Sequence, residues 1–157
     1  MVSAAKITNP PPKEPLTSLD AICRDFKWRF KKTKKTDQVV KFCRKAPDFS
    51  TAVIRACEAR DEYGKHHNHQ SKVDIEARRK FARKIIKLAN RGALDVGNFD
   101  RMHDGMDDIK PYGIGPVTVY DVAVRVGAYL GIYPKSVYMH AGVREGLKAL
   151  EDRKSVV

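Results

Sequence analysis

The spacing of apolar residues predicts helices along most of the chain and no strand. In residues 74–90, Ile75, Phe81, Ile85 and Leu88 recur at the spacing of one helix face, and Gly92 follows where a helix commonly ends. The same reasoning predicts helices that begin near residue 17 and that cover residues 37–45, 50–64, 98–109, 117–130 and 136–150. No segment alternates apolar and polar residues as a half-buried strand does. The pattern therefore predicts an all-α fold, a compact multi-helix domain.

Prolines and chain length set the expected domain limits. Residues 1–15 contain a run of three prolines and a further proline at position 15, which removes backbone donors and predicts a disordered, Pro-rich leader. Residues 16–151 are predicted to form a single helical domain, with a hairpin at 109–130, and residues 152–157 a tail. A chain of 157 residues is long enough for one such domain.

Finer expectations concern which side chains face inward. The helix over residues 50–64 is expected to start at a Ser50 or Thr51 cap and to bury Val53, Ile54 and Cys57. The helix over residues 117–130 is expected to bury a row of small apolar residues. Its charged residues Asp121 and Arg125 are then expected to pair at i and i+4 on the solvent side.

Charge is the first feature that points to a partner. The chain carries 31 Lys and Arg against 19 Asp and Glu, a formal net charge of +12. The excess is concentrated in residues 19–45 and 72–91, with net charges of +7 and +6, whereas residues 92–110 carry −3. Such segregation produces a directional field that attracts a polyanion, and nucleic acid is the first candidate. A basic surface without any partner is the alternative interpretation.

Other compositional features exclude several classes of protein. No run approaches the roughly 20 apolar residues that span a bilayer, so no membrane partner is expected. The start of the chain lacks the apolar segment of a secretory signal. The three cysteines, Cys23, Cys43 and Cys57, are far apart and odd in number, which argues against a disulfide scaffold and favours core thiols in a reducing compartment. The expected location is cytoplasmic, and nucleoid-associated if the chain is bacterial.

The most informative motif is a glycine-rich turn between two predicted helices. Gly113 and Gly115 flank Ile114, permit positive φ values and leave backbone amides uncovered, while Ile114 is expected to enter the core. Pro116 suits the first position of the next helix. Free amides at a helix start form a seat for a phosphate group. An ordinary tight turn between helices is the alternative.

This turn and the segment after it resemble the helix-hairpin-helix region of endonuclease-III-type DNA glycosylases. The matching parts are residues 113–118, residues 137–140, Val143 and Arg144. The resemblance spans residues 109–144 and implies double-stranded DNA held by a backbone phosphate.

The catalytic residues of that family are replaced. Val117 stands where the bifunctional members carry a lysine, and Tyr138 stands where the family has a carboxylate. Valine cannot form a Schiff base, and tyrosine cannot stabilise a developing cation as a carboxylate does. The four-cysteine iron–sulfur motif is absent as well, since the last cysteine is Cys57. The resemblance therefore implies a DNA-binding scaffold without glycosylase chemistry and without a cofactor.

These observations predict non-catalytic, largely sequence-independent DNA binding. The residues expected to contact nucleic acid are Gly113, Ile114, Gly115, Thr118, Lys80, Lys84, Lys87, Arg91, Arg29, Lys31, Lys32, Lys34 and Lys35. Lys80, Lys84, Lys87 and Arg91 form a stripe on one face of the predicted helix, because they recur at i, i+4, i+7 and i+11.

Two other functions remain open. One is a divergent base-excision or nuclease-like enzyme that uses Asp121, His140 or the histidine-rich loop, and the other is a basic adaptor that binds an acidic protein. His66 and His69 are close enough in sequence to share a metal ion. Because neither a Cys-x-x-Cys nor a His-Glu-x-x-His pattern accompanies them, no metal site is expected.

Overall fold

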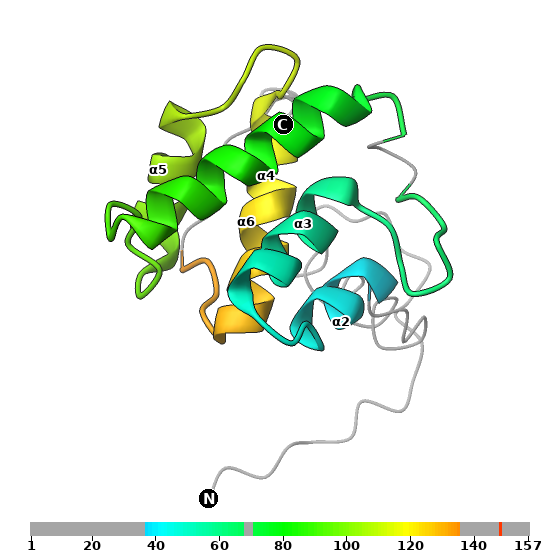
Figure 1. Cartoon of the computed structure of the whole chain (residues 1–157), viewed down its shortest axis with the longest axis horizontal. Helices are drawn as coiled ribbons and strands as arrows, with labels where there is room; N and C mark the ends of the chain where they lie inside the picture. The colour runs from blue at the N-terminus through cyan, green and yellow to red at the C-terminus, as the bar shows by residue number, and fades with distance from the viewer. Residues whose placement is uncertain (1–36, 68–70, 136–147, 149–157) are drawn as a thin grey trace, which may run out of the picture. The chain divides into compact units, whose positions relative to one another are not determined.

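The computed structural model describes residues 37–67, 71–135 and 148. These residues form helices α2 (Gln38–Arg44), α3 (Phe49–Glu58), α4 (Ile75–Asn90), α5 (Phe99–Asp108) and α6 (Pro116–Leu130) and no strand, apart from one isolated bridge between Arg60 and His66 (Figure 1). The predicted all-α fold is confirmed for this part of the chain. None of the helices described combines the length and the apolar character that crossing a bilayer requires.

Several predicted features lie outside the described residues. They are the Pro-rich leader, the first helix with Arg29, Lys31, Lys32, Lys34 and Lys35, and the segment 136–147 with His140. His69 and the tail at 152–157 lie outside as well.

Short polar side chains set where the helices begin. Asp37, Asp74 and Asn98 cap α2, α4 and α5, each accepting a hydrogen bond from a backbone amide in the first turn. The expected cap of α3 was wrong by two or three positions. Asp48 is its cap, because its carboxylate accepts both the Thr51 amide and the Thr51 hydroxyl at 2.8 Å. These hydrogen bonds also lower the pKa of the Asp48 carboxyl.

The end of α3 also differs from the expectation. The helix stops at Glu58 rather than near Gly64, since Ala59 adopts the left-handed region with φ of 55°. The Ala59 amide still donates to the carbonyl oxygen of Arg55, which closes the last turn. A left-handed residue at this position is a common helix stop, although glycine is the usual occupant.

Helix α6 occupies the centre of the described part. It packs against α2, α3 and α5, while α4 packs against α3. Val119, Val122, Ala123 and Val126 are fully buried along α6, as predicted from their spacing. The expected burial of Ile54 was wrong, because 44% of this residue is exposed, whereas its neighbours Val53 and Cys57 are buried.

Two arginines enter the core to satisfy the end of α3. Arg125, which was expected on the solvent side of α6, is only 2% exposed, and its Nη1 donates to the carbonyl oxygen of Ala56 at 3.1 Å. Arg78 of α4 is 3% exposed, and its Nη1 donates to the carbonyl oxygen of Glu58 at 2.7 Å. The carbonyls at a helix end carry partial negative charge and lack intrahelical donors. Both guanidinium groups therefore compensate the last turn of α3 from neighbouring helices.

The two described cysteines are core residues, as predicted. Burial raises the pKa of the Cys43 thiol to about 11 and raises that of the Cys57 thiol as well, although the nearby Arg125 opposes both shifts. We expect both thiols to be unreactive in the folded protein, because the thiolate is the reactive form. A Cys23→Ser variant isolates them for a thiol titration with Ellman's reagent. It should react only after unfolding in guanidinium, and fast reaction of the folded variant would contradict this prediction.

Candidate nucleic-acid interface

The connection between α5 and α6, residues 109–115, forms the glycine turn expected from the sequence. Gly113 is exposed and has φ of +89°, a conformation that favours glycine. Ile114 is 5% exposed and belongs to the hydrophobic core, which confirms its predicted role as the plug of the turn. The Ile114 amide donates to the carbonyl oxygen of Pro111 at 3.2 Å, so this amide closes the turn and is not free for a ligand.

The start of α6 is left uncapped. Gly115 is the N-cap residue, it offers no side chain, and Pro116 at the first helical position has no amide hydrogen. Within the described residues, the amides of Gly115, Val117 and Thr118 have no acceptor. Gly115 and Val117 are exposed, whereas Thr118 is only 7% exposed. The exposed free donors of this turn thus lie at Gly115, which was predicted, and at Val117, which was not, whereas Thr118 is buried.

The turn lies directly against α4. The Lys84 ammonium donates to the carbonyl oxygen of Ile109 at 3.0 Å, and a Cβ on Gly113 would lie 3.6 Å from the Cβ of Ala77. In Figure 1 the connection from α5 to α6 stands at the top of the view, beside α4. Ala77 and Lys84 are one heptad apart and share a helix face with Lys80 and Lys87. The structure therefore places the turn and the predicted basic stripe of α4 on one surface.

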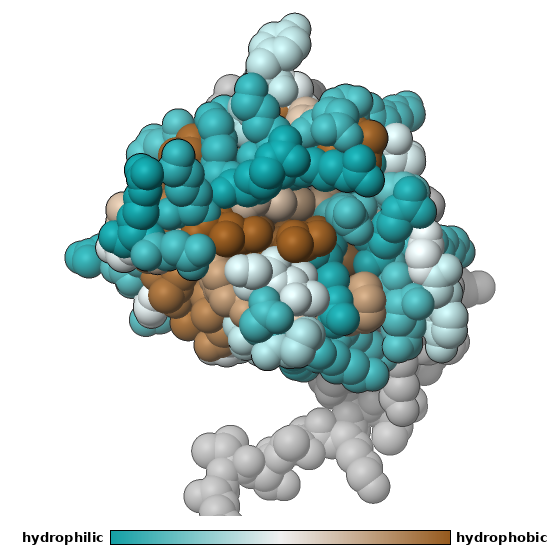
Figure 2. All heavy atoms as spheres, in the orientation of Figure 1, coloured by the Kyte–Doolittle hydropathy of each residue, from teal (hydrophilic) through white to brown (hydrophobic). Residues whose placement is uncertain are grey.

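Most of the cations on this surface have no acidic partner. Lys80, Arg83, Lys87 and Arg91 are exposed, and none forms an ion pair with a described residue. By contrast, the neighbouring Arg79 pairs with Glu76 at 2.8 Å. Figure 2 shows hydrophilic residues along this helix. The uncompensated charge of α4 is therefore available to an anion from solution.

Two acidic residues of α5 have local partners, and one of these partners, Lys110, is a cation. The Lys110 ammonium lies 2.7 Å from the Asp107 carboxylate, and His103 Nδ1 lies 3.2 Å from Asp104. Lys110 stands within the turn, and its ammonium also donates to the carbonyl oxygen of Asp107 at 3.2 Å, so this charge is held against the end of α5. Tyr112, next to Gly113, is fully exposed and offers an aromatic face to a ligand.

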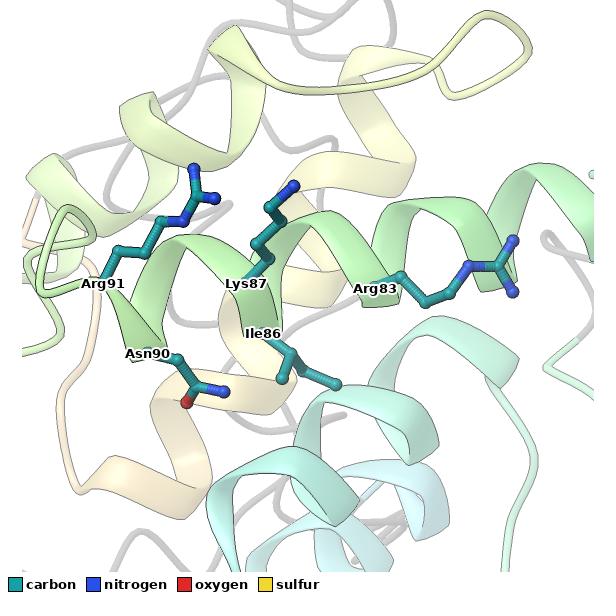
Figure 3. A pocket seen from close by; sticks show the side chains of 5 residues that line it. All are labelled: Arg83, Ile86, Lys87, Asn90 and Arg91. Atoms are coloured by element: carbon teal, nitrogen blue, oxygen red, sulfur yellow. The ribbon is translucent and has the colours of Figure 1, made fainter.

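A shallow hollow of about 400 Å³ lies on α4 next to the basic stripe (Figure 3). The residues that line it are Arg83, Ile86, Lys87, Asn90 and Arg91. Lys87 and Arg91 were predicted from the sequence, whereas Arg83, Ile86 and Asn90 were missed. Their spacing of i, i+3, i+4, i+7 and i+8 is that of one helix face, and this was the signal available in the sequence.

Asp121 and His66, which were named for the alternative enzyme and metal sites, do not belong to the surface formed by the turn and α4. Asp121 Oδ2 lies 4.0 Å from the Nη2 of Arg125, so this carboxylate faces the buried guanidinium. His66 Nδ1 is buried and has no hydrogen-bond partner among the described residues, and desolvation and the nearby Arg60 lower the pKa of the imidazole. Within the described part of the chain, no group of three or more potential ligands could hold a metal ion.

Comparisons with known proteins do not assign this chain to a family. No family model matches it, and neither a curated protein nor a solved structure gives a match. The function must therefore be inferred from the surface formed by the turn and α4.

Proposed function

We propose that this chain binds DNA without catalysing a reaction, chiefly through backbone phosphates, and that residues 109–130 act as a helix-hairpin-helix. The observation that carries the proposal is the shared surface of the uncapped α6 start and the unpaired cations of α4. A helix start offers directed donors and a positive partial charge to a phosphate. A row of cations beside it suits the regular negative charge of a DNA backbone.

The two parts of the surface have different tasks in this proposal. The amides of Gly115 and Val117 hold one phosphate in a fixed position, because backbone donors at a helix start cannot rotate away. Lys80, Lys87 and Arg91 neutralise phosphates along the same strand through flexible side chains. Contacts of both kinds read the backbone and not the bases, so the binding is largely independent of sequence.

Removing two α4 charges should weaken duplex binding in a salt-dependent way. We expect a Lys87→Gln/Arg91→Gln double variant to bind about tenfold more weakly at a fixed salt concentration. The slope of log Kd against log salt should fall by about two, since each lost phosphate contact removes about one released counterion. Fluorescence anisotropy of a short labelled duplex at several salt concentrations measures both quantities.

A charge-matched control distinguishes this surface from a general effect of net charge. Lys41 and Lys45 are exposed residues of α2 and its C-cap, and in Figure 1 α2 lies at the end of the view opposite the turn. A Lys41→Gln/Lys45→Gln variant should bind almost as tightly as the unmodified protein. Equal weakening of both double variants, or an affinity that does not respond to salt, would refute the proposed mechanism.

A further inference from the structure

The residues that line the hollow on α4 point to two sides of the helix, and the two sides differ in chemistry. In Figure 3, Lys87 and Arg91 point to one side of the helix, whereas Ile86 and Asn90 point to the other, and Arg83 extends along the helix. Figure 2 shows hydrophobic surface in the strip between α4 and α3, next to the hydrophilic row of α4. The hollow therefore has a cationic side and a side that combines an aliphatic contact with an amide.

The lining residues favour a ligand that is anionic at one end and flat and apolar at the other. Arg83, Lys87 and Arg91 supply donors for an anion, and none of the described residues that line the hollow carries a carboxylate. Ile86 offers an aliphatic face to a ring, and the Asn90 amide offers both a donor and an acceptor to the edge of a base. Phosphate contacts alone would leave Ile86 and Asn90 unused.

We infer that this hollow binds one unpaired nucleobase, with the phosphate of the same nucleotide on Lys87 and Arg91. The base then packs on Ile86 and hydrogen-bonds to Asn90. Base pairing and stacking in an intact duplex hide both base faces, so the ligand is a nucleotide in a single strand or in an opened position of a duplex. This inference rests on the proposed function for the phosphate contacts and adds a preference for strands whose bases are accessible.

The test compares two single strands of equal charge. Decathymidylate and an abasic decamer with the same number of phosphates are titrated against the full chain by fluorescence anisotropy at one salt concentration. The abasic strand reports the phosphate contacts, and the difference between the strands reports the base contact. We expect decathymidylate to bind roughly fivefold more tightly.

Two variants tie that difference to the hollow. Asn90→Ala and Ile86→Ala should each bring decathymidylate to the affinity of the abasic strand, with circular dichroism verifying that both variants are folded. Leu88→Ala is the matched control, because Leu88 is also partly buried against the core from α4 but does not line the hollow. This control should keep the fivefold preference.

The possible failures are distinguishable. If the unmodified protein binds neither strand but still binds the labelled duplex, only the inference is overturned, and if it binds neither the strands nor the duplex, the proposed function fails as well. If it binds both strands equally, or if the preference survives in both Asn90→Ala and Ile86→Ala, only the inference is overturned. Displacement of decathymidylate by an oligoglutamate of equal charge from the unmodified protein, but not from Asn90→Ala, would assign the hollow to an acidic protein and would also overturn it.

Discussion

A Gly115→Asp variant should bind duplex DNA about a hundredfold more weakly while remaining fully folded. Gly115 has extended backbone angles, φ −88° and ψ 168°, and open space where a Cβ would lie, so aspartate fits without strain. Its carboxylate would accept hydrogen bonds from amides in the first turn of α6, and these amides are the proposed phosphate donors. Loss of a charge-assisted contact and added repulsion together account for about 3 kcal/mol, or two orders of magnitude.

The same substitution should slightly stabilise the protein, which separates binding from folding. An acidic N-cap satisfies free donors and interacts favourably with the helix dipole, so the melting temperature should rise. Gly115→Asn has nearly the same shape without the charge and should weaken binding by about tenfold, the part due to competition for the amides. Anisotropy titrations and thermal unfolding by circular dichroism measure both effects. A folded Gly115→Asp variant that binds as tightly as the unmodified protein would remove the turn from the proposed interface.

Arg125→Ala should cost the protein about 3–5 kcal/mol of unfolding free energy. The substitution leaves the carbonyl oxygen of Ala56 without the Arg125 donor and leaves Asp121 facing a cavity in place of a guanidinium. Among the residues that the structure describes, Arg125 is the largest fully buried side chain, so its removal also costs packing. Breaking a buried, hydrogen-bonded charge is among the most destabilising single changes.

Two comparisons identify the source of that cost. Arg125→Met keeps much of the volume without the donor or the charge, and it should therefore destabilise less than Arg125→Ala. Arg79→Ala removes an exposed i, i+3 pair with Glu76 and should cost less than about 0.5 kcal/mol. Urea unfolding with an unchanged m-value gives these free energies. A cost of Arg125→Ala as small as that of Arg79→Ala would contradict the buried role.

Local patterns were sufficient for the positions of most helices in the described residues. The caps Asp74 and Asn98 start α4 and α5 where the spacing of apolar residues predicted, because capping and helix periodicity depend on residues a few positions apart. Where several residues near a helix start can act as the N-cap, as Asp48, Ser50 and Thr51 can at α3, the sequence alone does not show which of them caps the helix. The early stop of α3 at Ala59 was missed for a related reason, since alanine carries no stop signal of its own.

The residues near Arg125 in the sequence do not predict that its side chain is buried. Hydropathy places an arginine on the solvent side of an amphipathic helix, and an acidic residue at i−4 supplies a partner for it there. The acceptor that draws Arg125 inward is the carbonyl oxygen of Ala56, 69 residues away in the sequence. Only the packing of α3 against α6 brings the donor and the acceptor together.

By itself, the sequence determined the helical class of the described residues, the glycine turn with its buried Ile114 and the excess of positive charge. These features arise from side-chain periodicity, backbone sterics and composition, which act over short stretches of chain. The tertiary structure decided that the turn lies against Ala77 and Lys84, so that the uncapped start of α6 and the cations of α4 share a surface. That arrangement depends on how the helices pack through their buried side chains, and no local pattern of residues specifies it.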